Sequence, residues 1–315
     1  MSAPEETATN PAGLLAAGVL AVLVATACWA TSGIFVNFVM ADRQVSALAL
    51  AFWRDLATFA VLFSGLSVLR PGWLRISRRD LKWLAGLGSI GLGTFHVLWN
   101  LNVMLNGVAV ATVQQAAMPA IVAVAAWRLW REPLTWRKVL AIILTFAGTA
   151  LVSGLDVLGS ASGVRGSAFG LGLLVGLATP LAYAAYSLFG KPIAGYYRPL
   201  TILTYGFGCG ALTLLPFQMF TPQPWPVPGH TWLWFAVLIG WATIVPFSAY
   251  TFGLGRLPVS VAGILAMAEI PFASFYAHLL LGQRLTALQM AGAVLVVGGV
   301  LLLSWPRTFE RSNVA

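Results

Sequence analysis

Charged residues are scarce in this sequence of 315 amino acids. Asp, Glu, Lys and Arg together make up 9% of the chain, whereas hydrophobic residues make up 59%. A soluble domain has about 25% charged residues and roughly 45–50% apolar ones. The deficit of charge excludes a water-soluble enzyme with an ordinary surface, and the apolar excess excludes a disordered chain. The composition therefore predicts a protein whose solvent is largely lipid.

Cysteine and the usual catalytic patterns are also scarce. Cys28 and Cys209 both lie in apolar runs, which indicates small buried hydrophobic residues rather than a disulfide or metal framework. The sequence has no zinc-ligand spacing, nucleophile elbow, phosphate-binding loop or paired carboxylates. We therefore expect no cofactor, no ATPase domain in this chain and no enzymatic activity. A membrane-embedded enzyme is the alternative from a different functional class.

Long uncharged runs predict ten membrane-spanning helices in an all-α membrane protein. A span needs about 20 apolar residues, because the hydrocarbon core is ~30 Å thick and each helical residue rises ~1.5 Å. Asn106-Gly107 and the proline run at 222–228 are the expected turns inside two longer runs. The expected helices lie near 14–40, 46–69, two between Lys82 and Arg128, 138–155, one between Arg165 and Lys191, two between Arg198 and Arg256, 257–281 and 285–305.

The basic residues are distributed unevenly between the predicted loops. If the N-terminus is inside, fourteen of the 18 Lys and Arg residues fall in cytoplasmic segments, three fall outside and Arg54 lies within a span. An excess of Lys and Arg in cytoplasmic loops is the rule for membrane proteins. We therefore expect a multi-pass protein of the bacterial inner membrane with both termini in the cytoplasm. The same rule accounts for the net charge of +9 without nucleic acid as a partner.

The two halves of the chain resemble each other. Residues 95–119 begin FHVLWNL and end QQAAMP, and residues 247–271 begin FSAYTFG and end LAMAEIP, at an offset of 152. Five helices per half is an odd number, so the second half must enter the membrane in the opposite orientation. Inverted five-helix repeats are common in secondary transporters, with the substrate site at the repeat interface. The expected division is a cytoplasmic tail at 1–13, repeat I at 14–155, an outside connecting loop at 156–165, repeat II at 166–305 and a cytoplasmic tail at 306–315.

Two loop motifs resemble a known family. The first reads WREPLT at 130–135, and the second reads EIPFASFYAHLLLGQRLT at 269–286. Together with the 5+5 repeat, these motifs resemble the EamA type of the drug/metabolite transporter superfamily. Gln283 stands where that family usually has Glu. The resemblance implies a central cavity lined by helices 1, 3, 4, 6, 8 and 9, and often transport out of the cell.

Polar side chains on the third and fourth predicted helices are candidates for substrate binding. Because polar groups are costly within a membrane, they mark functional sites by default. His96, Trp99 and Asn100 share one helix face, and Gln114, Gln115 and Met118 precede a proline that can kink the next helix. The alternative is that these residues form interhelical packing contacts.

Aromatic and hydroxyl side chains recur at matching positions in the two halves. Trp29 and Ser32 align with Tyr183 and Tyr186 at an offset of about 154, and Tyr250 lies near the repeat partner of Trp99. Two such stripes facing a common axis would line a neutral aromatic cavity. Lipid-facing aromatic residues are the alternative.

Glu269 is the only acidic residue deep in the second repeat. A carboxylate at this depth is poorly solvated, so it could exchange a proton as access alternates, receive the ammonium group of a substrate, or serve a structural role. The candidate cavity has few charges, which disfavours phosphorylated substrates. We therefore expect a secondary transporter that exports small neutral or zwitterionic metabolites such as amino acids by alternating access, with protons as candidate coupling ions. Efflux of hydrophobic drugs is the alternative within transport.

Overall fold

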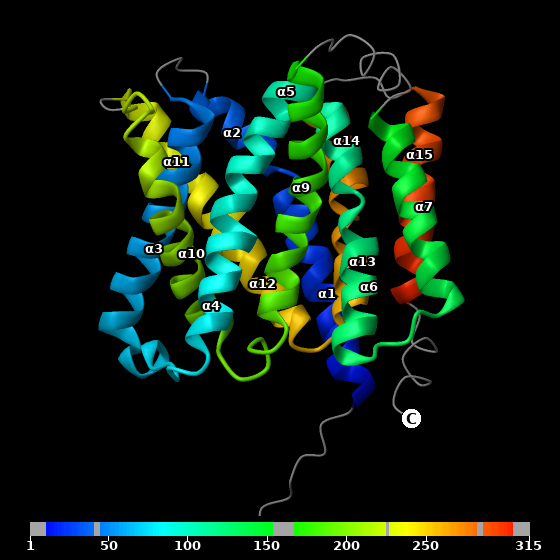
Figure 1. Cartoon of the computed structure of the whole chain (residues 1–315), viewed down its shortest axis with the longest axis horizontal. Coiled ribbons are helices and arrows are strands. Elements are labelled where there is room, and N and C mark those ends of the chain that lie inside the picture. The colour runs from blue at the N-terminus through cyan, green and yellow to red at the C-terminus, as the bar shows by residue number, and fades with distance from the viewer. Residues whose placement is uncertain (1–10, 41–44, 154–166, 225–226, 282–285, 305–315) are drawn as a thin grey trace, which may run out of the picture.

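The computed structural model is a bundle of helices that run between two faces (Figure 1). The structure describes residues 11–40, 45–153, 167–224, 227–281 and 286–304, so the predicted connecting loop and most of both tails lie outside the described residues. The helices are α1 (Pro11–Trp29), α2 (Ser32–Met40), α3 (Ala47–Leu69), α4 (Leu81–Gly88), α5 (Phe95–Gln115), α6 (Met118–Trp130), α7 (Trp136–Ser153), α9 (Ser167–Gly190), α10 (Pro199–Gln218), α11 (Gly229–Ile239), α12 (Val245–Leu254), α13 (Val259–Ala266), α14 (Glu269–Leu281) and α15 (Ala287–Ser304). A 3-10 turn, η1 (Pro71–Leu74), and two π-helical segments, η2 (Ser89–Thr94) and η3 (Gly240–Ile244), complete the described elements.

The all-helical membrane fold predicted from composition is confirmed. Among the described residues, nine helical stretches are long and apolar enough to cross a membrane. The expected fourth span is not among these nine stretches. A break at 116–117 separates α6 from the end of α5, which leaves α6 too short to be counted. The start of α1 and the end of α15 lie at the same face of the bundle, as an even number of crossings requires (Figure 1).

Two predicted boundaries differ from the structure. α5 continues through Asn106 and Gly107, where a turn was expected. The Asn106 side chain is satisfied there, because its Nδ2 atom donates to Asn102 Oδ1 at 2.6 Å and to the Gly172 carbonyl of α9 at 2.9 Å. The single helix expected at 14–40 is divided into α1 and α2, since the N–H and hydroxyl groups of Thr31 both bind the carbonyl of Cys28, three residues earlier.

Irregular segments recur at matching places in the two halves. The π-helical segment η2 in repeat I corresponds to η3 in repeat II, about 151 residues later. The break at 116–117 between α5 and α6 likewise corresponds to the break at 267–268 between α13 and α14. Such breaks leave backbone carbonyls and N–H groups without helical partners, and transporters use them at binding sites. The repeat detected by self-similarity therefore extends to the local backbone geometry.

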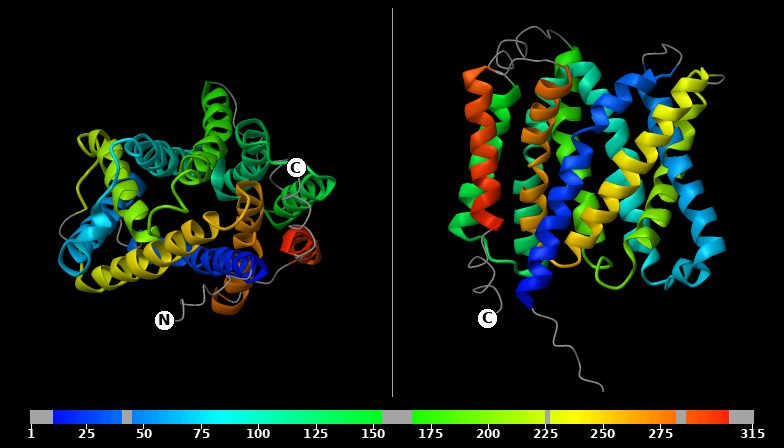
Figure 2. Two further views of the ribbon diagram at one scale, coloured as in Figure 1. Left: turned by 90° about the horizontal axis from the view of Figure 1, so that it is seen from below. Right: turned by 180° about the vertical axis from the view of Figure 1, so that it is seen from behind.

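Helices of one half pack mainly against helices of the other. α1 packs on α12 and α9 packs on α5, so the first helix of each repeat contacts the third helix of its partner. α3 lies against α10, and α7 lies against α15 at the side of the bundle (Figure 2). At the α7–α15 crossing, a Cβ atom added to Gly148 would lie 2.6 Å from the carbonyl oxygen of Gly292. Small residues at this crossing permit direct backbone contact.

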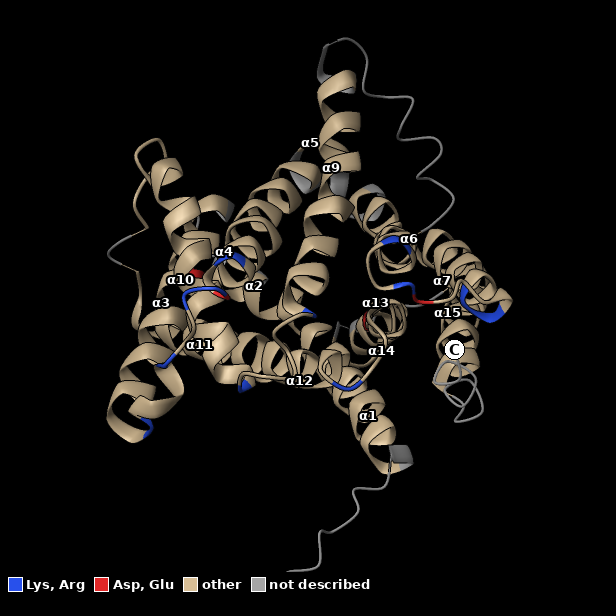
Figure 3. Ribbon diagram, turned by 60° about the horizontal axis from the view of Figure 1, so that its bottom comes forward, with Lys and Arg blue, Asp and Glu red and all other residues tan. Residues whose placement is uncertain are grey.

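Lys and Arg residues gather at the face where α1 begins and α15 ends (Figure 3). We call this the basic face. Among the described residues, it carries every Lys and Arg other than Arg54: Arg70, Arg75, Arg78, Arg79, Lys82, Arg128, Arg131, Arg137, Lys138, Lys191, Arg198 and Arg256.

Two charged side chains join neighbouring elements at the basic face. Glu132, after α6, accepts hydrogen bonds from Val259 N at 2.8 Å and from the backbone and hydroxyl groups of Ser260, at the start of α13. Lys191, after α9, donates to the carbonyls of Leu254 and Leu257 beyond α12. Burial lowers the pKa of Lys191 from its ordinary value, and the charge of Glu132 opposes this shift. The Glu132 contact therefore joins repeat I to repeat II, while the Lys191 contact joins two elements of repeat II.

Candidate functional site

A cavity of about 640 Å³ lies between the two repeats. Its lining includes Ser32, Gly33 and Val36 on α2 and Val152 and Ser153 at the end of α7, so it extends toward the face opposite the basic face. Most of the candidate site residues taken from the sequence line this cavity: Trp29, Ser32, His96, Trp99, Asn100, Gln115, Tyr183 and Glu269. Residues far apart in the chain therefore converge on one volume.

Four other candidates lie outside the cavity lining. Met118 is buried in the core, and the Gln114 amide packs against Gly176 of α9. Tyr186 shares a hydrogen bond with the Thr251 hydroxyl at 2.7 Å, and Tyr250 shares one with the Ser187 hydroxyl at 2.8 Å. Both tyrosine hydroxyls are thus occupied between α9 and α12.

Two pairs of aromatic rings form opposite parts of the cavity wall. Trp29 of α1 meets Phe247 of α12 edge to face, with ring centroids 4.9 Å apart. Tyr183 of α9 stacks on Phe95 of α5, with centroids 4.7 Å apart. The two pairs are related by the repeat, because Trp29 aligns with Tyr183 and Phe95 aligns with Phe247. Contacts of this kind contribute about 0.5–1.5 kcal/mol beyond burial, so these walls are well ordered.

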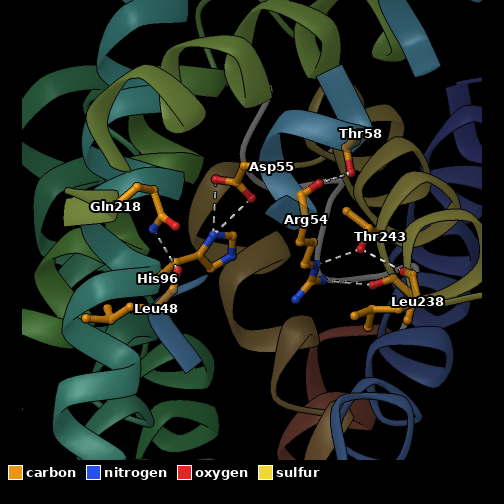
Figure 4. A network of polar contacts seen from close by, with 9 residues as sticks. Leu48, Arg54, Asp55, Thr58, His96, Gln218, Leu238 and Thr243 are labelled. Carbon is orange, nitrogen blue, oxygen red and sulfur yellow. Dashed lines mark hydrogen bonds and ion pairs between the residues drawn. The ribbon is translucent and has the colours of Figure 1, made fainter. Parts of the chain in front are cut away.

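Arg54 is a cavity residue that the sequence alone did not select. The sequence places it only within a span, and the structure directs its side chain to repeat II (Figure 4). The Nε atom donates to Thr243 Oγ1 at 2.8 Å, and Nη2 donates to the Ala242 carbonyl at 3.2 Å. Both acceptors belong to the π-helical segment η3. The irregular backbone of η3 therefore anchors a cation that lines the cavity.

Glu269 supplies the opposite charge. It is the first residue of α14, directly after the break at 267–268, and its side chain lines the same cavity as Arg54. Within the described part of the chain it forms no hydrogen bond and no ion pair, although Arg54 is near enough to interact with it electrostatically. The N-terminal end of a helix favours a negative charge. The carboxylate is therefore placed to bind a cationic group.

Asp55 and His96 form a buried pair behind the cavity wall. Asp55 is fully buried and His96 is 8% exposed. The Nδ1 atom of His96 lies 3.2 Å from one carboxylate oxygen of Asp55 and 3.3 Å from the other (Figure 4). Among the described residues, Asp55 Oδ1 has no hydrogen-bond partner of acceptable geometry. Asp55 follows Arg54 directly, so these adjacent residues point to different neighbours, as their positions on a helix require.

Two related groups of helices around a shared polar cavity define a membrane transporter with internal repeats. Comparison with known families supports this class directly. The model of the EamA-like transporter family matches residues 16–154 and 170–305. The chain therefore belongs to the EamA-like transporter family, within the drug/metabolite transporter superfamily, and acts on small-molecule substrates in a lipid bilayer.

Curated relatives cover nearly the whole chain. An uncharacterized inner membrane transporter of Salmonella typhimurium is 28% identical over 296 residues, covering 91% of this chain and 95% of that protein. A probable terminal-alkyne amino-acid exporter of Streptantibioticus cattleyicolor is 23% identical over 308 residues, covering 96% and 97%. A solved structure matches with a TM-score of 0.75 at 21% identity, covering 90% of this chain and 95% of that one, which shows that the fold is shared.

Proposed function

We propose that this transporter exports small neutral or zwitterionic metabolites, with amino acids as the substrate class, by alternating access. One observation carries the proposal: Arg54 and Glu269, of opposite charge, line a single cavity with aromatic walls. An amino acid carries one carboxylate and one ammonium group, and it adds no net charge to the cavity. A zwitterion therefore matches both charges without leaving a surplus.

Each charged residue has capacity for a substrate group. A guanidinium has five N–H donors, and the two hydrogen bonds of Arg54 to η3 leave three of them for a carboxylate. Glu269, which has no hydrogen-bond partner among the described side chains and backbone groups, can accept from an ammonium group. Trp29, Phe95 and Tyr183 offer apolar surface for the rest of the molecule. Most of a ligand pocket is normally apolar, with a few polar groups that fix orientation.

The probable amino-acid exporter of Streptantibioticus cattleyicolor supports the substrate class and the direction of transport, although its identity to this chain is only 23%. We place the basic face in the cytoplasm, because Lys and Arg accumulate in cytoplasmic loops. Both termini are then cytoplasmic in the bacterial inner membrane. The cavity extends toward the other face, so we infer that this state faces the outside.

Exchange in liposomes tests the proposal. Vesicles containing the purified protein and unlabelled L-leucine should take up labelled L-leucine, or another neutral L-amino acid from the same panel. Leucinamide, which lacks the carboxylate, and 4-methylpentanoate, which lacks the ammonium, should compete weakly. The absence of exchange for every neutral amino acid in the panel would refute the proposed substrate class.

Variants at the two charged positions sharpen the test. Arg54→Gln should weaken competition by L-leucine much more than competition by leucinamide. Glu269→Gln should likewise erase the preference for L-leucine over 4-methylpentanoate. Ser274→Ala is the matched control, since Ser274 lines the same cavity but its hydroxyl donates to Ile270 O within its own helix. If Glu269→Gln instead exchanges normally but no longer responds to a pH gradient, Glu269 is a coupling residue and not an ammonium ligand.

Efflux of hydrophobic drugs is the second candidate function, because aromatic rings form much of the cavity wall. It predicts that apolar cations compete with each other and that the neutral variants of Arg54 and Glu269 transport them as well as the parent protein does. The same competition assay therefore separates the two candidates.

A further inference from the structure

We propose that Asp55 and His96 form the proton-binding site that couples transport to a pH gradient. The proposal rests on the exporter function described above and identifies its coupling ion and the residues that carry it. It assigns the proton to a site separate from Glu269, which is left to bind the substrate ammonium group.

The geometry of the pair suits reversible proton binding. The His96 ring contacts both carboxylate oxygens of Asp55 through Nδ1, at 3.2 and 3.3 Å. His96 also lines the cavity, whereas Asp55 is fully buried behind it. Water in the cavity can therefore reach the imidazole, while the carboxylate holds the ring in one orientation. Histidine is the side chain that ordinarily gains and loses a proton near neutral pH.

Charge balance explains why the pair would hold a proton. A buried carboxylate is costly unless a counter-charge accompanies it. Arg54 and Glu269 cancel each other's formal charge, which leaves Asp55 as a surplus negative charge when His96 is neutral. Protonation of His96 makes the set of four groups neutral, and deprotonation returns it to a single negative charge.

Apart from Arg54 and Glu269, no charged side chain near the Asp55–His96 pair is found among the described residues that line the cavity. Arg54 shares α3 with Asp55, Glu269 lies on α14, and Tyr183 on α9 is a further titratable group. α10, which packs against α3, carries no charged side chain from Pro199 to Gln218. Gln218 is also drawn in Figure 4, but its amide nitrogen, Nε2, donates to the Leu48 carbonyl at 3.4 Å.

Proton binding and substrate binding then oppose each other. The added proton bonds to the imidazole and brings a positive charge to a cavity that also receives the substrate ammonium group. With His96 neutral, the surplus negative charge of Asp55 attracts the substrate ammonium group, and protonation of His96 cancels that attraction. The outward-facing protein would thus release substrate as His96 takes up a proton. His96 would then release that proton on the cytoplasmic side before the next substrate binds.

Direct observation of the histidine rings tests the proton site without any substrate. The chain has only three histidines, so ¹⁵N-histidine labelling gives a simple spectrum in which His230→Gln and His278→Gln identify the other two signals. We expect the spectrum to show the His96 ring in both its neutral and its protonated form across the pH range used for the transport assays. Its signal should also respond to Asp55→Asn, whereas that of the exposed His230 should not. A His96 ring that keeps one protonation state across this range would overturn the proposal.

Transport assays then test coupling. Wild-type protein should accumulate L-leucine, or the exchanged amino acid identified above, against its gradient when a pH gradient is imposed. For His96→Gln and Asp55→Asn, pH-driven accumulation should fall at least tenfold relative to each variant's own exchange rate at equal pH. His230→Gln is the matched control for the same substitution at an exposed site, and it should keep both activities.

The outcomes separate this inference from the proposed function. Failure of the wild type to exchange any neutral amino acid refutes the substrate class, while the histidine titration still decides whether the proton site exists. Exchange with pH-driven accumulation intact in His96→Gln overturns the coupling role. If His96→Gln is poorly folded, His96→Asn and the wild-type titration supply the same decision.

Discussion

The Glu132 contact at the basic face predicts a measurable shift in the balance between two states of the transporter. The carboxylate joins repeat I to the start of α13 in repeat II, through Val259 N at 2.8 Å and the Ser260 hydroxyl. The alternating-access mechanism proposed above requires this face to open, which would break these bonds. Hydrogen bonds to a charged group contribute about 1.5–3 kcal/mol each. Only part of that energy is lost on opening, because water can solvate the released groups.

Glu132→Ala removes both strong bonds and leaves the first N–H groups of α13 without a side-chain acceptor. We expect the closed state of this face to lose about 3 kcal/mol relative to the open state, which is on the order of a hundredfold in the equilibrium. Glu132→Gln keeps one oxygen acceptor but loses the charge. Since charge-assisted bonds are roughly twice as strong as neutral ones, this variant should shift the equilibrium by about tenfold.

The assay is maleimide labelling of a single cysteine at Ala194, which is buried next to Gly255 at this face. Cys28 and Cys209 are first replaced by Ser, and inside-out vesicles present the basic face to the reagent. Labelling should accelerate in the order parent, Glu132→Gln, Glu132→Ala. Arg128→Ala, at an exposed position of the same region, is the matched control and should label at the parent rate. Equal labelling rates in all four proteins would refute the prediction that Glu132 stabilises the closed state of the basic face.

Three further predictions follow from the packing and the charge distribution. Cysteines placed at Arg79 and Arg137 should react only from the cytoplasm, and one placed in the 222–229 loop only from outside; the reverse pattern would contradict the orientation proposed above. Gly148→Val should reduce the folded yield severely, since even a Cβ atom would lie 2.6 Å from the Gly292 carbonyl, and normal yield and thermal stability would show that α7 and α15 separate easily. Phe247→Ala should loosen Trp29 and weaken substrate competition more than it lowers protein abundance, because the rings pack at 4.9 Å; equal losses of abundance and affinity would indicate a packing role only.

The sequence by itself determined the solvent of this protein and the plan of its fold. Apolar runs long enough to span a membrane, in a chain with only 9% charged residues, require a lipid environment. Self-similarity at an offset of 152 determined the repeat. The same offset relates Phe95 to Phe247, and an offset of 154 relates Trp29 to Tyr183. These features depend only on local pattern, which the chain carries without reference to its neighbours.

The tertiary structure alone decided which side chains meet. Helical spacing placed Tyr183 and Tyr186 on the same side of one helix, yet Tyr183 lines the cavity while Tyr186 bonds to Thr251 of α12. The sequence did not indicate that Arg54 lines the cavity, because its hydrogen-bond acceptors lie in η3, nearly 190 residues later. Periodicity fixes the direction of a side chain relative to its helix axis, whereas the partner depends on how that helix is rotated against the others. That rotation results from the packing of all the helices together, so no local pattern contains it.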